Sequence, residues 1–353
     1  MDITELLKLI VEKGASDLHL KVPSVPVLRI DGELIPQTDY PKITPEWIKE
    51  TMSTIVTKEQ LNEFQENMEL DFSYSIPGVS RFRVNASRQR GTITLALRLI
   101  KWEIPVIESL GLPEICKELV TLPNGLVLVT GPTGSGKSTT LASMVEYLNM
   151  DQRRRVITIE DPIEYLFNDQ KCTITQRELG TDTLSFSSAI IHALRQDPDV
   201  ILVGEMRDLA TINTAITAAE TGHLVLSTLH TSSASQAVDR IIDVFSPEEQ
   251  QQIRLQLSNV LMGVIYQSLL HKSDGAGRIP AVEVMIATSA VRNQIREGKT
   301  HQIMSTIQTG ASFGMQTLNQ SLANLVKENL VSVEDAMAKS NDPKELDDFL
   351  GAQ

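Results

Sequence analysis

The sequence predicts an α/β protein of two domains, a small one with an antiparallel sheet followed by a larger one built on a parallel sheet. Three observations predict it. The 353 residues are enough for two domains at about 150 residues each. The hydrophobic share of 41% is ordinary globular usage and excludes a disordered or collagen-like chain. Near residue 100, strands joined by tight turns give way to short apolar runs separated by helical stretches.

The first domain is expected over residues 1–100. Apolar residues recur at helical spacing over 3–13, and Gly14 then ends the helix. Alternating apolar and polar residues predict a strand over 17–22, and Asp31-Gly32 between two short apolar runs predicts a hairpin. The remaining elements expected here are helices within 44–66 and strands at 80–87 and 92–100.

A proline-containing linker with a short helix is expected over residues 101–124, and the second domain over 125–353. Short apolar runs alternating with helices predict a parallel sheet covered on both faces. We expect its buried strands at 126–130, 156–159, 200–203 and 224–229. The last hundred residues are predicted to be mostly helical, with one helix opening at Ser246-Pro247.

Composition narrows the classes of partner. The net charge is −13, which argues against non-specific electrostatic binding to nucleic acid or anionic lipid. Cys116 and Cys172 stand 56 positions apart and form no CxxC, so neither a disulfide framework nor a four-cysteine zinc site is expected. The chain opens without a basic segment and has no apolar run near 18 residues. We therefore expect no membrane span and a cytoplasmic location.

Residues 131–138 fit the phosphate-binding pattern GxxxxGK[ST] at every fixed position, between a predicted strand and a predicted helix. Glycines let backbone N–H groups surround phosphate oxygens, the lysine supplies charge to the outer phosphates, and the serine hydroxyl reaches Mg²⁺. A chance glycine- and serine-rich loop is the alternative. The predicted nucleotide-binding residues are Gly131, Pro132, Thr133, Gly134, Ser135, Gly136, Lys137, Ser138 and Thr139.

Carboxylates follow two of the predicted parallel strands, where open α/β sheets hold their ligands. Glu160-Asp161-Pro162-Ile163-Glu164 follows one strand, and Gly204-Glu205 follows the next. A hydrolase needs a carboxylate to orient or deprotonate water, and a metal ion needs oxygen ligands. Gly204 stands where an aspartate is usual, so Glu205 would act without that partner. A solvated acidic loop is the alternative for either group.

Two histidines bracket a further predicted strand, His223 before it and His230 after it. Their odd separation points the rings to opposite faces of a regular strand, so they are not expected to chelate one metal. A polar residue after a strand beside Glu205 is well placed to sense the terminal phosphate, which makes His230 the candidate. The alternative for both is a packed structural histidine.

The first domain contains a basic segment. Between Asp71 and Glu103 there is no acidic residue, and every charged residue is an arginine or a lysine. If Arg90-Gly91 is a two-residue hairpin turn, residues whose numbers sum to 181 face each other. This register places the apolar residues together on one face and sets Arg83 opposite Arg98 on the other. Like charges directly opposite are destabilising, so an anion between them is expected. A solvated edge hairpin is the alternative.

Taken together, the motifs resemble the type II/type IV secretion ATPase superfamily, and most closely its type IV pilus retraction (PilT-like) branch. The segments that carry the resemblance cover essentially the whole chain. The segment 290–297 is similar to the retraction signature AIRNLIRE and departs from it at Val291 and Gln294. The other segments are Ala15-Ser16-Asp17-Leu18-His19-Leu20, the phosphate loop, the acidic residues 160–164, Gly204-Glu205 and the stretch from Thr221 to His230.

The resemblance implies a PAS-like first domain, a RecA-like second domain and a hexameric motor that hydrolyses ATP with Mg²⁺ to retract pili. It implies Glu164 as general base and Glu205 with Ser138 at Mg²⁺, the reverse assignment of the two glutamates staying open. It also implies that Arg83 and Arg98 reach a neighbouring subunit's phosphates, with Arg207 as a weaker candidate. Implied partners are an inner-membrane pilus platform protein, where the cytoplasmic motor would be peripherally bound, and a paralogous retraction ATPase.

Three alternatives remain at this point: a nucleic-acid-translocating RecA-type motor, a pilus extension or secretion ATPase, and a nucleotide-dependent scaffold. Residues 290–297 are read as a helix that couples the motor to its load. Val291 and Ile295 would be buried on one face, whereas Arg292 and Arg296 would form an exposed basic stripe. An ordinary amphipathic helix is the alternative.

Overall fold

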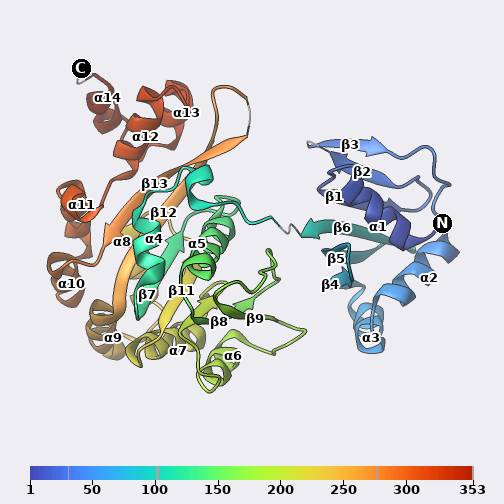
Figure 1. Cartoon of the computed structure of the whole chain (residues 1–353), viewed down its shortest axis with the longest axis horizontal. Helices are drawn as coiled ribbons and strands as arrows, with labels where there is room; N and C mark the ends of the chain where they lie inside the picture. The colour runs from blue at the N-terminus through green and yellow to red at the C-terminus, as the bar shows by residue number, and fades with distance from the viewer. Residues whose placement is uncertain (31, 101–102, 276, 352–353) are drawn as a thin grey trace. The chain divides into compact units, whose positions relative to one another are not determined.

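The computed structural model describes residues 1–30, 32–100, 103–275 and 277–351 (Figure 1). The chain divides into two compact units. One consists of Met1–Glu103 with Glu164–Leu166, and the other of Ile104–Ile163 with Phe167–Gln353. Each unit has its own sheet and its own buried apolar cluster.

The first unit contains a six-stranded antiparallel sheet in the order β3-β2-β1-β6-β5-β4. Its strands are β1 (Asp17–Lys21), β2 (Val27–Ile30), β3 (Glu33–Pro36), β4 (Glu69–Ile76), β5 (Ser80–Gln89) and β6 (Thr92–Ile100). Its helices are α1 (Ile3–Glu12), α2 (Pro45–Ile55) and α3 (Lys58–Asn67).

Apolar residues on one face of this sheet pack against the three helices. Phe82, Val84 and Leu97 are fully buried there, in one cluster with Leu6 of α1 and Ile48 of α2. Side chains alternate between the faces of a strand, so Arg83 and Arg98 project from the opposite face, whereas Arg88 lies on the apolar face with its guanidinium over the Phe64 ring. The exposed side chains of Arg83 and Arg98 are therefore held by strands of the sheet.

The second unit contains a seven-stranded sheet in the order β13-β12-β7-β11-β10-β8-β9, parallel except for the β12–β13 pair. The strands are β7 (Gly125–Thr130), β8 (Arg155–Glu160), β9 (Thr173–Glu178), β10 (Val200–Val203), β11 (Leu224–Leu229), β12 (Leu261–His271) and β13 (Arg278–Ile286). The α-helices are α4 (Ile115–Thr121), α5 (Lys137–Asp151), α6 (Phe186–Ala193), α7 (Leu209–Glu220), α8 (Ala234–Ile242), α9 (Pro247–Val260), α10 (Ser289–Arg296), α11 (Ile303–Gln308), α12 (Leu318–Lys327), α13 (Val333–Lys339) and α14 (Pro343–Gly351). Short 3₁₀ helices span η1 (Ile107–Leu110), η2 (Thr300–Gln302) and η3 (Ala311–Phe313).

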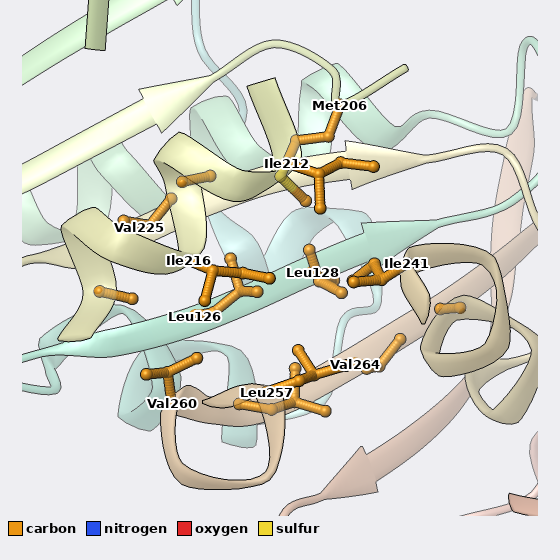
Figure 2. Packing of buried hydrophobic residues seen from close by; sticks show 14 of the residues in the cluster. Leu126, Leu128, Met206, Ile212, Ile216, Val225, Ile241, Leu257, Val260 and Val264 are labelled. Atoms are coloured by element: carbon orange, nitrogen blue, oxygen red, sulfur yellow. The ribbon is translucent and has the colours of Figure 1, made fainter. Parts of the chain in front are cut away.

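Helices cover both faces of the second sheet, as predicted for buried parallel strands. Figure 2 shows one face, where Leu126 and Leu128 of β7 lie among side chains of α7, α8 and α9. On the other face, Val127 and Val129 pack with residues of α4 and α5. Successive residues of β7 alternate between these two clusters, so both faces of the strand are packed against helices. This packing fixes the position of the strand end at which the following loop begins.

Most predicted elements are confirmed, and the differences lie in the strands. The register of the β5–β6 hairpin is the predicted one, with Phe82 opposite Leu99 and Arg83 opposite Arg98. The two turn residues Arg90 and Gly91 both have positive φ, 48° and 77°, as type I′ turns require. Of the other predictions, Asp31 of the first hairpin and residues 101–102 of the linker fall outside the described residues.

Four strands were not predicted: β4, β9, β12 and β13. The last hundred residues are therefore only partly helical, because β12 and β13 add a long antiparallel pair to the main sheet. Continuous apolar runs such as the one beginning at Leu261 have no clear period, so their pattern does not separate a buried strand from a buried helix. The helix predicted to open at Ser246 is α9, and Ser246 and Glu249 form a capping box there.

Two smaller expectations concern cysteine and the membrane. Cys116 and Cys172 are buried free thiols. Burial raises the pKa of Cys116 to about 12. Within the described ranges, no helix is long and apolar enough to cross a bilayer.

Candidate active site

The phosphate loop has the predicted strand–loop–helix context. β7 ends at Thr130, the glycine-rich turn follows, and α5 begins at Lys137. Gly131, Gly134 and Gly136 have φ values of 144°, 77° and 89°, which L side chains rarely adopt. Gly136 is the N-cap of α5 and has no side chain with which to occupy the first N–H groups of the helix. Free N–H groups at a helix N-terminus, together with the helix dipole, are the features with which proteins bind phosphate, so the local geometry suits the predicted role.

Lys137 is buried, and its ammonium group is directed back onto the loop. Its Nζ donates hydrogen bonds to the carbonyl oxygens of Gly131 and Pro132, both at 3.0 Å. Ser138 and Thr139 follow in the first turn of α5 and are half-buried. The loop therefore brings one fixed positive charge and two hydroxyl groups to the end of β7.

A second group of charged residues comes from the ends of β10 and β11, which pair in parallel. Glu205 follows β10, and its Oε1 lies 2.6 Å from Arg207 Nε. His230 follows β11, and its Nε2 lies 3.7 Å from Glu205 Oε2. The hydroxyl of Thr228 donates to the Gly204 carbonyl at 2.6 Å, which fixes the two strand ends to each other.

The pKa of His230 is lowered from its usual 6.5 by burial and by the charge of Lys137, against the opposing effect of Glu205. Because β7, β11 and β10 are neighbours that pair in parallel, the residues following them, among them Lys137, Glu205 and His230, are brought to one edge of the sheet. A neutral imidazole can accept as well as donate a hydrogen bond. The predicted position of His230 beside Glu205 is confirmed, and its role as a sensor of the terminal phosphate stays a prediction.

Gly204 stands where an aspartate is usual, and it lies close to the end of β8. A Cβ at this position would lie 3.3 Å from the Ile159 carbonyl oxygen and 3.4 Å from the Glu160 Cα. A side chain here would therefore require the end of β8 to move by a few tenths of an ångström. Oxygen ligands for Mg²⁺ would come from Ser138 and Glu205, and such ions are held by one or two protein oxygens with the phosphates. No group of three or more His, Cys, Asp or Glu suited to a metal occurs among the described residues.

The acidic loop after β8 is tethered at several points. Buried Glu178 of β9 accepts a hydrogen bond from the Ile163 N–H through Oε2 at 3.0 Å. Farther along, buried Asn149 of α5 donates to the Asn168 carbonyl at 2.8 Å. Glu164 lies between these tethers and is exposed. Its role as the general base stays a prediction.

His223 has a structural role. It lies just before β11, at the opposite end of the strand from His230, and its Nδ1 is 3.0 Å from the Ala218 carbonyl near the end of α7. The ring therefore contacts a carbonyl at the end of a helix, which is the environment expected of a packed structural histidine.

The arginine pair of the first unit is not left unbalanced. Asp17 of β1 lies opposite Arg98 across the sheet, and its Oδ1 is 2.8 Å from Arg98 Nε. Burial would raise the pKa of Asp17, but hydrogen bonds from Ser16 and Arg98 outweigh it and hold the pKa below its usual value. The expected anion beside Arg98 is thus partly supplied by the protein, although the Arg98 side chain stays 69% exposed.

The prediction for residues 290–297 was wrong for one residue. Val291 and Ile295 are buried and Arg296 is exposed, as expected. Arg292 is half-buried and donates to the carbonyl oxygens of Ser258 and Asn259, both at 2.6 Å. These carbonyls lie at the C-terminal end of α9, where helices leave acceptors unsatisfied. Arg292 therefore holds α9 and α10 together and is not part of an exposed stripe.

One buried residue beside the phosphate loop was not found from the sequence. Gln267 of β12 hydrogen-bonds both the loop and α5. Its only signal in the sequence is a polar residue within the apolar run that begins at Leu261.

Comparison with known proteins agrees with this geometry. A family model described as type II/IV secretion system protein matches residues 2–339. The type IV pilus retraction ATPase PilT of Pseudomonas aeruginosa is 49% identical, over 98% of this chain and 99% of its own length. A twitching motility protein of Neisseria gonorrhoeae is 46% identical over 91% of this chain and 86% of its own. A crystal structure of the pilus retraction motor PilT with bound ADP is similar with a TM-score of 0.92 and 48% identity, covering 99% of each chain.

Proposed function

Because the chain belongs to the type II/IV secretion system protein family, we propose that it hydrolyses ATP to retract type IV pili and so drives twitching motility. The observation that carries the proposal is that Lys137, Glu205 and His230 all follow neighbouring parallel strands at the same edge of the sheet, with His230 Nε2 3.7 Å from Glu205 Oε2. The retraction ATPases among its relatives confirm the resemblance seen in the sequence motifs. They also support a PAS-like first domain and a RecA-like second one.

The nucleotide would bind through the backbone of residues 131–136, with Lys137 on the outer phosphates. The related motor with bound ADP supports this part of the proposal. Ser138 and Glu205 would hold Mg²⁺, which would neutralise phosphate charge during hydrolysis.

Water activation requires a carboxylate or a polar side chain near the terminal phosphate. Glu164 is the proposed general base, because it is exposed in a loop tethered on both sides. The reverse assignment, with Glu205 as base, is separated from it by experiment. His230 would report the terminal phosphate, since it follows β11 and its Nε2 lies 3.7 Å from Glu205 Oε2 at the end of the neighbouring strand β10.

A homohexamer would complete the site, with Arg83 and Arg98 of one subunit reaching the nucleotide of the next. Both arginines are exposed on the polar face of the first unit's sheet, which supports a role toward another molecule. The motor would act in the cytoplasm, peripherally bound at the inner membrane to a pilus platform protein and working beside a paralogous retraction ATPase.

Hydrolysis by the purified protein tests the proposal. Lys137→Ala should abolish ATP turnover, because the charge on the outer phosphates disappears while the fold stays intact. Glu164→Gln should bind ATP but lose turnover by about 10²-fold or more, as when a positioned base is removed. Normal hydrolysis by Glu164→Gln together with an inactive Glu205→Gln would reverse the two roles.

A deletion strain tests the biological assignment. Loss of a retraction motor should leave many pili and no twitching, whereas loss of an extension motor should leave no pili. Strong stimulation of the purified ATPase by DNA would instead favour a nucleic-acid motor, which the net charge of −13 disfavours.

A further inference from the structure

Gln267 contacts two points beside the proposed phosphate site, one in the glycine-rich loop and one in the first turn of α5. The residue lies on β12, next to β7 in the sheet, and only 1% of it is exposed. Its Nε2 donates to the Ser135 carbonyl oxygen in the phosphate loop. Its Oε1 accepts a hydrogen bond from Thr140 Oγ1 in the first turn of α5, at 2.8 Å. One side-chain amide thus uses a donor and an acceptor at once.

The phosphate loop also packs closely against β12. A Cβ at Gly131 would lie 2.4 Å from the Gln267 carbonyl oxygen, and a Cβ at Gly136 would lie 3.1 Å from Gln267 Nε2. These two fixed glycines of the motif are therefore required by the neighbouring strand as well as by their own backbone angles. The close approach leaves no room for the loop to relax toward β12.

We propose that Gln267 is a positioning residue, which holds the phosphate loop in the shape that binds the nucleotide. Ser135 and Thr140 flank Lys137, Ser138 and Thr139, so fixing these two points fixes the lysine and the first-turn N–H groups between them. The inference rests on the proposed function only in taking this loop as the phosphate site. It predicts that nucleotide affinity depends on a residue more than 120 positions beyond the motif.

The first test replaces the amide by a side chain of similar length. Gln267→Met keeps the volume and removes both hydrogen bonds. We expect the Kd for a fluorescent ADP analogue (mant-ADP) and the KM for ATP to rise about ten-fold, the value of one well-placed hydrogen-bonding side chain. kcat should change less than about three-fold, because the loop binds ground state and transition state alike. Gln267→Glu should weaken binding further, since a carboxylate would face the Ser135 carbonyl and the phosphates.

A matched control separates positioning from general stability. The buried hydroxyl of Ser321 accepts a hydrogen bond from the Val282 N–H of β13 at 3.1 Å, in the same unit. Ser321→Ala should leave the Kd for mant-ADP unchanged. An equal loss of affinity in Ser321→Ala and Gln267→Met, or wild-type affinity in a folded Gln267→Met, would overturn the proposal.

A second test changes Thr140, the other partner of the hydrogen bond, so that its single variants can be measured even if Gln267→Met does not fold. Thr140→Val removes the hydroxyl that donates to Gln267, whereas Thr140→Ser keeps it and should restore affinity. In a double-mutant cycle on mant-ADP binding, Thr140→Val and Gln267→Met should be clearly non-additive. Wild-type affinity in Thr140→Val, or additive effects, would contradict the inference. If the wild type binds mant-ADP but does not hydrolyse ATP, the proposed function fails while this inference is still decided.

Discussion

Two arginine pairs, one in each unit, differ in what their charges are used for. On the β5–β6 hairpin, Arg98 pairs with a carboxylate and stays mostly exposed, and Arg83 opposite it is exposed as well. On α10, Arg292 turns inward onto backbone carbonyls, and only Arg296 faces solvent. Both arginines of the first pair are therefore accessible to another molecule, whereas in the second pair only Arg296 is.

The difference follows from what each element leaves unsatisfied. Strand backbones inside a sheet are paired, so a guanidinium group there finds only side chains such as Asp17. The end of α9 leaves carbonyl groups without helical partners, and Arg292 on the neighbouring helix satisfies them. An arginine near a helix end is thus more readily used inside the fold than one on a strand face.

The largest expected effect tests whether the hairpin arginines act on another subunit. Arg98→Ala should lower ATP turnover by about 10³-fold, the effect of losing an arginine that stabilises transferred phosphate. Mixed with the equally inactive Lys137→Ala, it should regain activity, because about a quarter of the interfaces in a randomly mixed ring pair an intact phosphate loop with an intact arginine.

Mixed oligomers must first be shown by mass spectrometry. If they form and stay inactive at every ratio, Arg98 does not act across a subunit boundary. Its difference from Arg292 would then be one of exposure alone.

A smaller but clear effect is expected from Arg292→Ala. The substitution leaves the carbonyl groups of Ser258 and Asn259 without their charged donor, so the free energy of unfolding should fall by about 2 kcal/mol. Urea unfolding followed by circular dichroism measures it. Unchanged stability in Arg292→Ala would show that these carbonyls are satisfied by water and that the arginine is dispensable to the fold.

Arg296→Ala provides the matched comparison on the same helix. Because Arg296 is exposed, its loss should change the free energy of unfolding by less than about 0.5 kcal/mol. ATP turnover should stay within about two- to three-fold of the wild type. If α10 couples the motor to its load, twitching should nevertheless be lost. Loss of hydrolysis in proportion to motion would instead place Arg296 at the catalytic interface.

The smallest effect concerns Asp17 and pH. Its pKa is lowered in the folded state, so its contribution to stability is present above the usual value of 3.8 and is lost as pH falls through the lowered folded value. Asp17→Asn should therefore cost about 0.5 kcal/mol or less near neutral pH, since Arg98 is largely exposed, and nothing in strong acid. Urea unfolding across acidic pH measures the difference; a constant difference would show that the pair is not electrostatic.

The parts predicted well from sequence were those set by short-range rules. A two-residue turn fixes the whole register of a hairpin, so Arg83 and Arg98 were placed opposite each other correctly. A phosphate loop between a buried strand and a helix has few alternatives, and Glu205 and His230 were placed together because parallel strands end at one edge.

The parts that were missed depend on partners far along the chain. Asp17 lies beside Arg98 only because β1 pairs with β6, and Gln267 meets Ser135 only because β12 lies beside β7. No spacing within either segment indicates such pairings. Arg292 was misplaced because helical periodicity treats a charged residue as solvent-facing, although its long side chain can reach the end of a neighbouring helix.

The buried thiols of Cys116 and Cys172 have a consequence for labelling chemistry. The thiolate is the nucleophile toward maleimides, and burial raises the pKa of both cysteines. Cys172 is further occupied as a donor to the Gln152 carbonyl at 3.2 Å. A cysteine placed at Leu184, which is 94% exposed, should therefore react selectively in the native protein. A single fluorophore or spin probe could then be attached to the active protein without first replacing Cys116 and Cys172.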